Sequence, residues 1–73
     1  MKILKTSQGH EIMVDDNIYE DASKLNWQLD KDGYPVSKYP FQVYLHRAVM
    51  GYPHEQVDHR DHNLLNCQRS NLR

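Results

Sequence analysis

Turn-forming residues divide this chain into short segments, and they constrain its fold more than any other feature. Glycine or proline stands at Gly9, in the Asp32-Gly33 pair, at Gly51 and at Pro53. An Asp-Gly pair favours tight hairpin turns, and glycine readily adopts the positive φ that such turns require. Because the apolar patterns between these turns are short, we expect short strands and short helices.

The first 25 residues predict a hairpin followed by a helix. Lys2–Lys5 and Glu11–Val14 indicate two strands, joined by a turn over Ser7–His10. Asp15 stands where a helix N-cap belongs, and acidic residues crowd the positions after it, where the helix dipole favours them. Three apolar residues recur at helical spacing on one face: Ile18, Ala22 and Leu25. We therefore expect an amphipathic helix over Asp16–Leu25.

The rest of the chain alternates short strands with one more helix. Strands are expected over four segments: Trp27–Leu29, Tyr34–Ser37, Gln42–Tyr44 and Gln56–Asp58. Pro40 interrupts the extended structure between the second and third of these strands, because proline cannot donate to a strand ladder. A helix is expected over Leu45–Met50, stopped by Gly51 and Pro53, and a loop over Asp61–Asn66. The predicted fold class is α+β, with short antiparallel strands and two short helices.

Length and composition limit the class of protein. Seventy-three residues make one small domain, in which we separate an N-terminal strand and helix region, 1–43, from a motif region, 44–73. No apolar run approaches the 18 residues of a transmembrane helix, so no membrane association is expected. The single Cys67 cannot form an intrachain disulfide or a four-cysteine zinc site, which favours a reducing cytoplasm.

Charge is distributed unevenly along the chain. The formal net charge is −1, but residues 1–33 hold four lysines against seven acids, whereas residues 34–73 hold five lysines or arginines against three acids. A surface that binds a polyanion is therefore expected in the second half. Ordinary surface charge is the alternative interpretation.

The Asp58-His59 pair carries the strongest chemical signal. An imidazole that titrates near neutral pH can deprotonate an attacking water, and a hard carboxylate oxygen suits Mg²⁺ or Mn²⁺. Adjacent residues on a regular strand point to opposite faces, so both side chains can face one phosphate only if the strand bends. The alternative interpretation is a hydrogen-bonded turn without chemistry.

The second half resembles the HNH endonuclease family, specifically its phage and intron homing-type branch. Four segments carry the resemblance in order and spacing: Tyr44-Leu45-His46-Arg47, Val57-Asp58-His59, Leu65-Asn66-Cys67-Gln68 and Ser70-Asn71-Leu72-Arg73. The opening residues Thr6–Gly9 and Val14–Asp16 are also similar to the start of such phage proteins. The resemblance implies the ββ part of a ββα-metal motif, DNA as the substrate, and a phage-encoded protein in the bacterial cytoplasm.

The resemblance also implies roles for the Asp-His pair. His59 would be the general base, and Asp58 would hold one divalent metal, Mg²⁺ or Mn²⁺, with no zinc expected. Three departures from the family pattern bear on activity. Cys67 stands where the family has its middle Asn, His62 stands where it has a loop glycine, and the His or Asn of a following helix has no counterpart before Arg73.

The remaining candidate residues have mixed interpretations. Guanidinium groups suit phosphate oxygens, so Arg69 and Arg73, and with less support Arg47, are candidate DNA contacts. A structural role is expected for His46, Asn66 and Asn71; an Asn side chain readily fixes loop backbone. A zinc site made of Cys67 with two histidines is a weaker alternative, because no fourth ligand is evident.

Two hypotheses of function follow. The first is a metal-dependent DNA endonuclease of homing type, or the N-terminal fragment of one. The second is a nuclease-dead HNH relative that binds DNA, or that binds a protein such as a host defence nuclease. The intact Asp58-His59 pair favours the first hypothesis, whereas Cys67 and the absent third motif residue favour the second.

Overall fold

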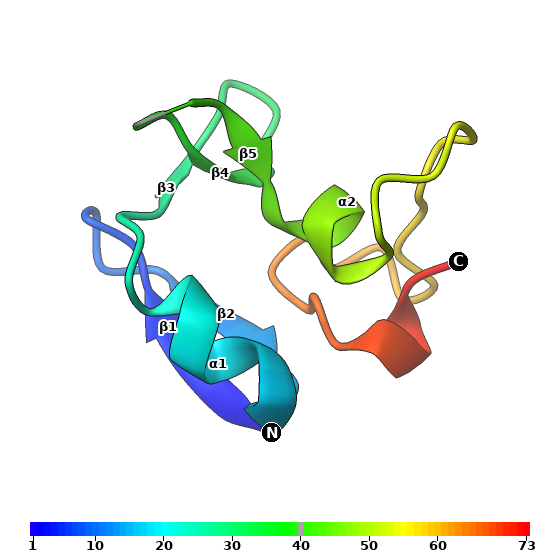
Figure 1. The fold of residues 1–73 in the computed structure, drawn as a ribbon, viewed down its shortest axis with the longest axis horizontal. Coiled ribbons are helices and arrows are strands. Elements are labelled where there is room, and N and C mark those ends of the chain that lie inside the picture. The colour runs from blue at the N-terminus through cyan, green and yellow to red at the C-terminus, as the bar shows by residue number, and fades with distance from the viewer. Residues whose placement is uncertain (40) are drawn as a thin grey trace.

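A computed structural model describes residues 1–39 and 41–73, and Figure 1 shows their arrangement. The chain opens with the predicted hairpin. Strand β1 (Lys2–Lys5) pairs antiparallel with β2 (Glu11–Val14), with Leu4 opposite Ile12. Gly9 closes the turn at φ +92°, a conformation that costs glycine little. Both Leu4 and Ile12 face the core, which fixes the register of the pair.

Helix α1 (Asp16–Ala22) begins where the sequence predicts but ends three residues before Leu25. Its end is fixed by Trp27, whose indole Nε1 donates to the carbonyl oxygen of Ala22 at 2.8 Å. Asp15 occupies the N-cap position, as predicted, although its side chain makes no capping hydrogen bond. Its carboxylate instead accepts from the backbone N–H of Arg69 at 3.0 Å, which ties the helix start to the distant end of the chain.

A three-stranded antiparallel sheet follows in the order β3-β4-β5. Its strands are β3 (Gln28–Leu29), β4 (Pro35–Ser37) and β5 (Val43–Tyr44). Each is shorter than predicted. Trp27, placed in a strand by its pattern, forms instead an isolated parallel bridge with Thr6. The β3–β4 turn is the expected one, and Asp30 Oδ1 secures it by accepting from the N–H groups of Asp32 and Tyr34, both at 2.9 Å. The expected interruption at Pro40 lies outside the described residues.

Helix α2 (Leu45–Val49) continues directly from β5 and ends one residue before the predicted Met50. The backbone reverses there, with Gly51 at φ +78° and Tyr52 at φ +54°. The N–H of Tyr52 donates to the carbonyl oxygen of Arg47 at 2.8 Å. In Figure 1, α2 lies between the three-stranded sheet and the C-terminal segment.

The predicted strand over Gln56–Asp58 is wrong, because backbone pairing begins only at Asp58, its last residue. Asp58 and Arg73 exchange two backbone hydrogen bonds, of 2.8 and 3.0 Å, and the N–H of Arg60 donates to Asn71 at 2.7 Å. His59 and Leu72 form the antiparallel bridge between them. We call residues 58–60 and 71–73 the terminal pair. A 3₁₀ turn (Arg69–Asn71) leads into its second segment.

The buried core takes residues from both halves of the chain. Its members come from the hairpin, both helices, the terminal pair and the connecting segments: Leu4, Ile12, Val14, Ala22, Trp27, Leu45, Val49, Val57, Cys67 and Leu72. Met13 of β2 also exchanges backbone hydrogen bonds with Leu65 and Cys67, both of 2.8 Å. The predicted α+β class, with short antiparallel strands and two short helices, is confirmed. Among the described residues, no helix is long and apolar enough to cross a membrane.

Candidate functional site

His59 lies inside the molecule, at the centre of an aromatic and sulfur cluster. Its side chain is 1% exposed, and its Nε2 lies 3.9 Å from Cys67 Sγ. The ring centroids of His46 and Tyr34 lie 5.3 and 6.0 Å away. Burial lowers the pKa of His59, an effect that the nearby carboxylates of Asp61 and Asp58 oppose. The imidazole is therefore neutral near pH 7 and could accept a proton, but bulk water does not reach it.

Asp58 lies on the opposite face of the same segment. Its side chain is 62% exposed, and its Oδ2 lies 3.6 Å from Nη2 of Arg73. The second oxygen, Oδ1, accepts from the backbone N–H of His59 at 3.1 Å. Because the terminal pair keeps this segment extended, successive side chains alternate between faces. The structure therefore places Asp58 and His59 on opposite faces rather than around one reacting phosphate, and the bend that would bring them together is not present here.

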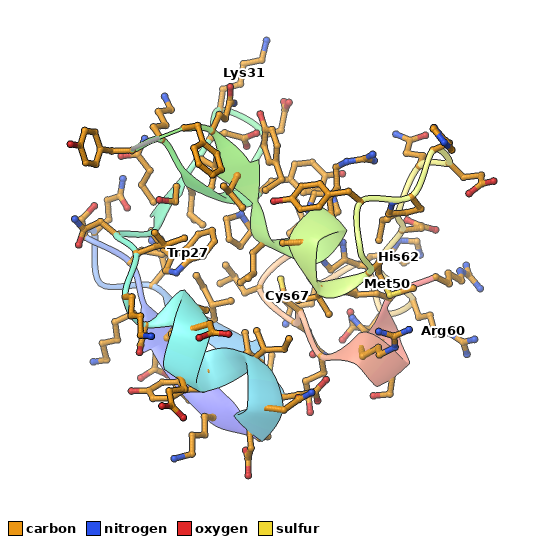
Figure 2. The ribbon with its side chains drawn as sticks, in the orientation of Figure 1. Trp27, Lys31, Met50, Arg60, His62 and Cys67 are labelled. Atoms are coloured by element: carbon orange, nitrogen blue, oxygen red, sulfur yellow. The ribbon has the colours of Figure 1, made fainter. Side chains whose placement is uncertain are left out.

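His46 and Cys67 complete the cluster behind His59. The His46 ring stacks on Tyr34, with centroids 4.9 Å apart and planes inclined at 27°. Burial is the main cause that lowers the pKa of His46 to about 4; the charges of His59 and Arg47 add to it, and Asp30 opposes it. Burial also raises the pKa of Cys67 to about 12, so its sulfur is a thiol. Figure 2 shows Cys67 near the centre of the molecule.

Asp61 organises the loop that follows His59, a role that the sequence analysis missed. Its Oδ1 accepts from the N–H of Asn63 and from Asn71 Nδ2, both at 2.9 Å, and its Oδ2 accepts from Asn66 Nδ2 at 3.0 Å. The hydrogen bond from Asn66 is the first cause that lowers the pKa of Asp61, followed by those from Asn63 and Asn71. The side chain of Asn71 also donates to the carbonyl oxygen of Asn66 at 3.0 Å. The sequence signal for this role is an acid in a loop followed by several Asn residues, whose side-chain amides can donate to it.

The three candidate DNA-binding arginines lie in different environments. The Arg47 guanidinium is half-buried and donates to the carbonyl oxygens of Pro53, at 2.6 Å, and Glu55, at 3.5 Å, so it braces the loop after α2. Arg69 and Arg73 are exposed. Arg69 Nη1 contacts the carbonyl oxygen of Val49 at 3.4 Å. Arg60 is also exposed, and its side chain points outward in Figure 2.

Within residues 1–39 and 41–73, no group of three or more His, Cys, Asp or Glu side chains is arranged to hold a metal ion. Asp58 offers one hard carboxylate oxygen, and its nearest charged neighbour is the cation of Arg73. The described donors therefore do not form a divalent-metal centre as they stand, and no catalytic step can be derived through a metal from this arrangement.

These features define a small α+β unit whose terminal pair, with the Asp-His pair in its first segment, is consistent with the ββ part of a ββα motif. The chain is 45% identical over 59 residues to an uncharacterized HNH endonuclease of Acanthamoeba polyphaga mimivirus. The match covers 71% of this chain and 32% of that protein, so the chain spans about a third of the relative's length. No family model matches the chain, and no solved structure does.

The similarity supports a relationship to HNH endonucleases at the level of the family. It does not distinguish the homing-type branch from other branches. The name of the relative specifies no substrate, cofactor or protein partner.

Proposed function

We propose that this chain carries part of an HNH-type site that hydrolyses DNA phosphodiesters. The terminal pair is the observation that carries the proposal. It joins the Asp58-His59 segment to the Arg73 segment through three backbone hydrogen bonds of 2.7 to 3.0 Å, and it sets a carboxylate and a guanidinium side by side on the surface. The homing-type branch, a phage-encoded origin and action in a host cytoplasm are finer parts of the same proposal.

Arg73 and Arg69 are the residues that we expect to bind the phosphate backbone. The ion pair between Arg73 and Asp58 is long, at 3.6 Å, and both side chains are more than half exposed. Exposed pairs of this kind contribute little to stability, so Arg73 can exchange Asp58 for a phosphate oxygen at small cost. Guanidinium-phosphate hydrogen bonds are charge-assisted and stronger than neutral ones.

His59 is the proposed general base. A neutral imidazole can take a proton from water, and a pKa below its ordinary value keeps it neutral at pH 7. Its side chain must turn outward from the Cys67 contact before water or phosphate can reach it. We therefore expect further residues to be needed to open and complete the site.

Asp58 is the proposed ligand of Mg²⁺ or Mn²⁺, which would neutralise charge on the phosphate. With one carboxylate, the 73 residues should bind Mg²⁺ no more tightly than about millimolar, because stronger sites use several oxygen ligands. Calorimetry of the wild type and of Asp58→Asn measures this. Micromolar binding that survives Asp58→Asn would place the metal elsewhere.

Plasmid nicking tests the nuclease proposal directly. We expect no nicking with Mg²⁺ or Mn²⁺ by the 73 residues alone. When a family-type helix bearing Asn or His is appended after Arg73 and Cys67 is changed to Asn, nicking should appear. His59→Gln should then lower it by roughly 10²–10⁴-fold, the usual effect of losing a general base. Strong His59-dependent nicking by the unextended chain would contradict the need for added residues.

A second candidate function is a nuclease-dead HNH relative that binds DNA or a protein, such as a host defence nuclease. The observation that favours it is the burial of His59, which is 1% exposed and packed on Cys67. If the extended variant binds DNA but never nicks it, and Asp58→Asn leaves that binding unchanged, the binding function is supported and the nuclease proposal fails.

A further inference from the structure

A polar cavity of about 260 Å³ opens between the β3–β4 turn and the start of α2. Eight residues line it, among them Asp30, Asp32, Tyr34, Tyr44, His46, Arg47 and Val57. Two carboxylates, two phenol rings, an imidazole and a guanidinium thus belong to its lining residues. Asp58, whose side chain points to the solvent beside Arg73, is not part of its lining. The cavity is therefore distinct from the proposed phosphate contacts.

The carboxylates of this cavity are held by the turn itself. Asp30 Oδ1 accepts from the N–H groups of Asp32 and Tyr34, which fixes the Asp30 carboxylate beside the cavity. The Asp32 side chain is exposed and makes no hydrogen bond or ion pair with the described residues. Arg47 also reaches the cavity, but its guanidinium donates to the carbonyl oxygens of Pro53 and Glu55. The two acids thus outnumber the one cation.

His46 supplies a second, independent observation. The side chain is 8% exposed and lines the cavity. Its Nδ1 is fully buried and has no hydrogen-bond partner among the described residues. An unpaired buried nitrogen is costly, so such atoms usually have a role. Because the pKa of His46 is lowered to about 4, the ring is neutral at pH 7 and adds no positive charge to the cavity.

We propose that this cavity binds an ammonium or guanidinium group. Two carboxylates balance the charge, and the rings of Tyr34 and Tyr44 can attract a cation through their π-systems. The unpaired Nδ1 of His46 is the acceptor for an N–H donor once the ring turns toward the ligand. The source that we favour is an arginine or lysine side chain of a peptide; a free small amine has the same chemistry. A bare metal ion fits less well, since no three ligating side chains converge within the described parts of the chain.

The test is an NMR titration of the whole chain with methylguanidinium and with the blocked peptides Gly-Arg-Gly and Gly-Gln-Gly. Saturable shifts of the Tyr34, His46 and Val57 amides by the Arg peptide, and none by the Gln peptide, are expected. Tighter binding of the peptide than of methylguanidinium identifies a side-chain site, and the reverse order identifies a site for free amines; either order supports the proposal.

Three variants sharpen this test. Asp32→Asn should weaken binding by about two- to five-fold, the usual worth of an exposed ion pair. His46→Phe, which keeps the ring that stacks on Tyr34, should weaken it by about tenfold or more, because a hydrogen bond to a charged group is lost. Glu20→Gln on α1 is the matched control and should change nothing. Shifts that never saturate, equal shifts with the Gln peptide, or an Asp32→Asn variant that binds like wild type would each overturn the proposal.

Discussion

At the scale of single residues, the buried imidazoles of His46 and His59 are the most unusual groups. Burial is the first cause that lowers the pKa of each, because desolvation disfavours the charged form. Both rings also lie close enough, 5.3 Å between centroids, for two positive charges to repel. The folded protein therefore resists protonation of this pair more than the unfolded chain does.

Because the folded protein resists protonation of these imidazoles, we expect it to lose stability in mild acid. His46 has an ordinary pKa of 6.5 and a folded pKa of about 4, so between these values the unfolded chain binds more protons. The free energy of unfolding should therefore be fully present above pH 6.5 and should fall as the pH drops toward 4. Thermal unfolding measured from pH 7.5 to 4 checks this.

His46→Phe should reduce this acid sensitivity, because the variant keeps the ring stack on Tyr34 and loses one titrating group. His54→Gln removes an exposed imidazole and should leave the pH profile unchanged. A His46→Phe variant that loses stability in acid as steeply as wild type would show that other groups cause the loss.

A second residue-scale prediction concerns His62, which has φ +61°. This left-handed conformation costs a residue with a Cβ about 1–2 kcal/mol, whereas glycine adopts it freely. His62→Gly should raise the free energy of unfolding by about 0.5–1 kcal/mol, since glycine also loses more backbone freedom on folding. His54→Gly, at an exposed position outside the positive-φ set, should instead lower it. Chemical denaturation of both variants decides, and equal effects would contradict the strain at residue 62.

At the scale of elements, the terminal pair depends on the hydrogen bonds that the Asp61 carboxylate accepts from Asn63, Asn66 and Asn71, which we call the Asp61 hub. The Asp61 carboxylate holds Asn66 and Asn71, and Asn71 begins the segment that pairs with residues 58–60. We expect Asp61→Ala to loosen that pairing without unfolding the β1–β2 hairpin. Hydrogen exchange should then speed up at the amides of Asp58, Arg60 and Arg73, and stay slow at Leu4.

Glu55→Ala is the matched control, since this exposed acid contributes a backbone carbonyl rather than its carboxylate to the contacts around it. Uniformly faster exchange in Asp61→Ala would mean that the hub supports the whole fold. No change at Arg60 would mean that the terminal pair holds without it.

Local signals in the sequence account for much of the fold. The β1–β2 hairpin and the start of α2 follow from turn residues and apolar spacing over a few positions. Contacts between distant residues explain the failures. Trp27 caps α1 early, and Asp15 bonds Arg69 across 54 positions instead of capping its own helix. Local periodicity predicts neither contact, because both depend on tertiary packing.

The candidate site divides in the same way: its residue types are visible in the sequence, but its tertiary contacts are not. The residue types locate the Asp-His pair, but the bend that a shared site requires is absent, because pairing with residues 71–73 keeps the segment extended. The burial of His59 against Cys67 could not be predicted, because it requires the C-terminal segment to fold back beside it. The Asp61 hub was missed because an acid in a polar loop is usually a solvated one.

At the scale of the whole molecule, charge is separated between the two halves. The first half holds most of the acids, and several of them are exposed on or near α1. The second half holds Arg60, Arg69 and Arg73, which are exposed as well. Polyanions should therefore approach through the C-terminal side. Arg47 differs from these three, because its guanidinium is occupied by loop carbonyl oxygens.

The salt dependence of DNA binding tests this separation. Each lost phosphate contact should lower the slope of log K against log salt by about one. The double variant Arg69→Ala, Arg73→Ala should therefore lower the slope by about two, whereas Arg47→Ala should lower thermal stability and barely change the slope.

Lys24→Ala, on the acidic half beside Asp21, is the control, and it should change neither the slope nor the thermal stability. Fluorescence anisotropy with a short duplex at several salt concentrations gives these slopes. An unchanged slope in the double variant would exclude this face, and a slope lowered by one in Arg47→Ala would show that its guanidinium leaves the carbonyls of Pro53 and Glu55 to reach DNA.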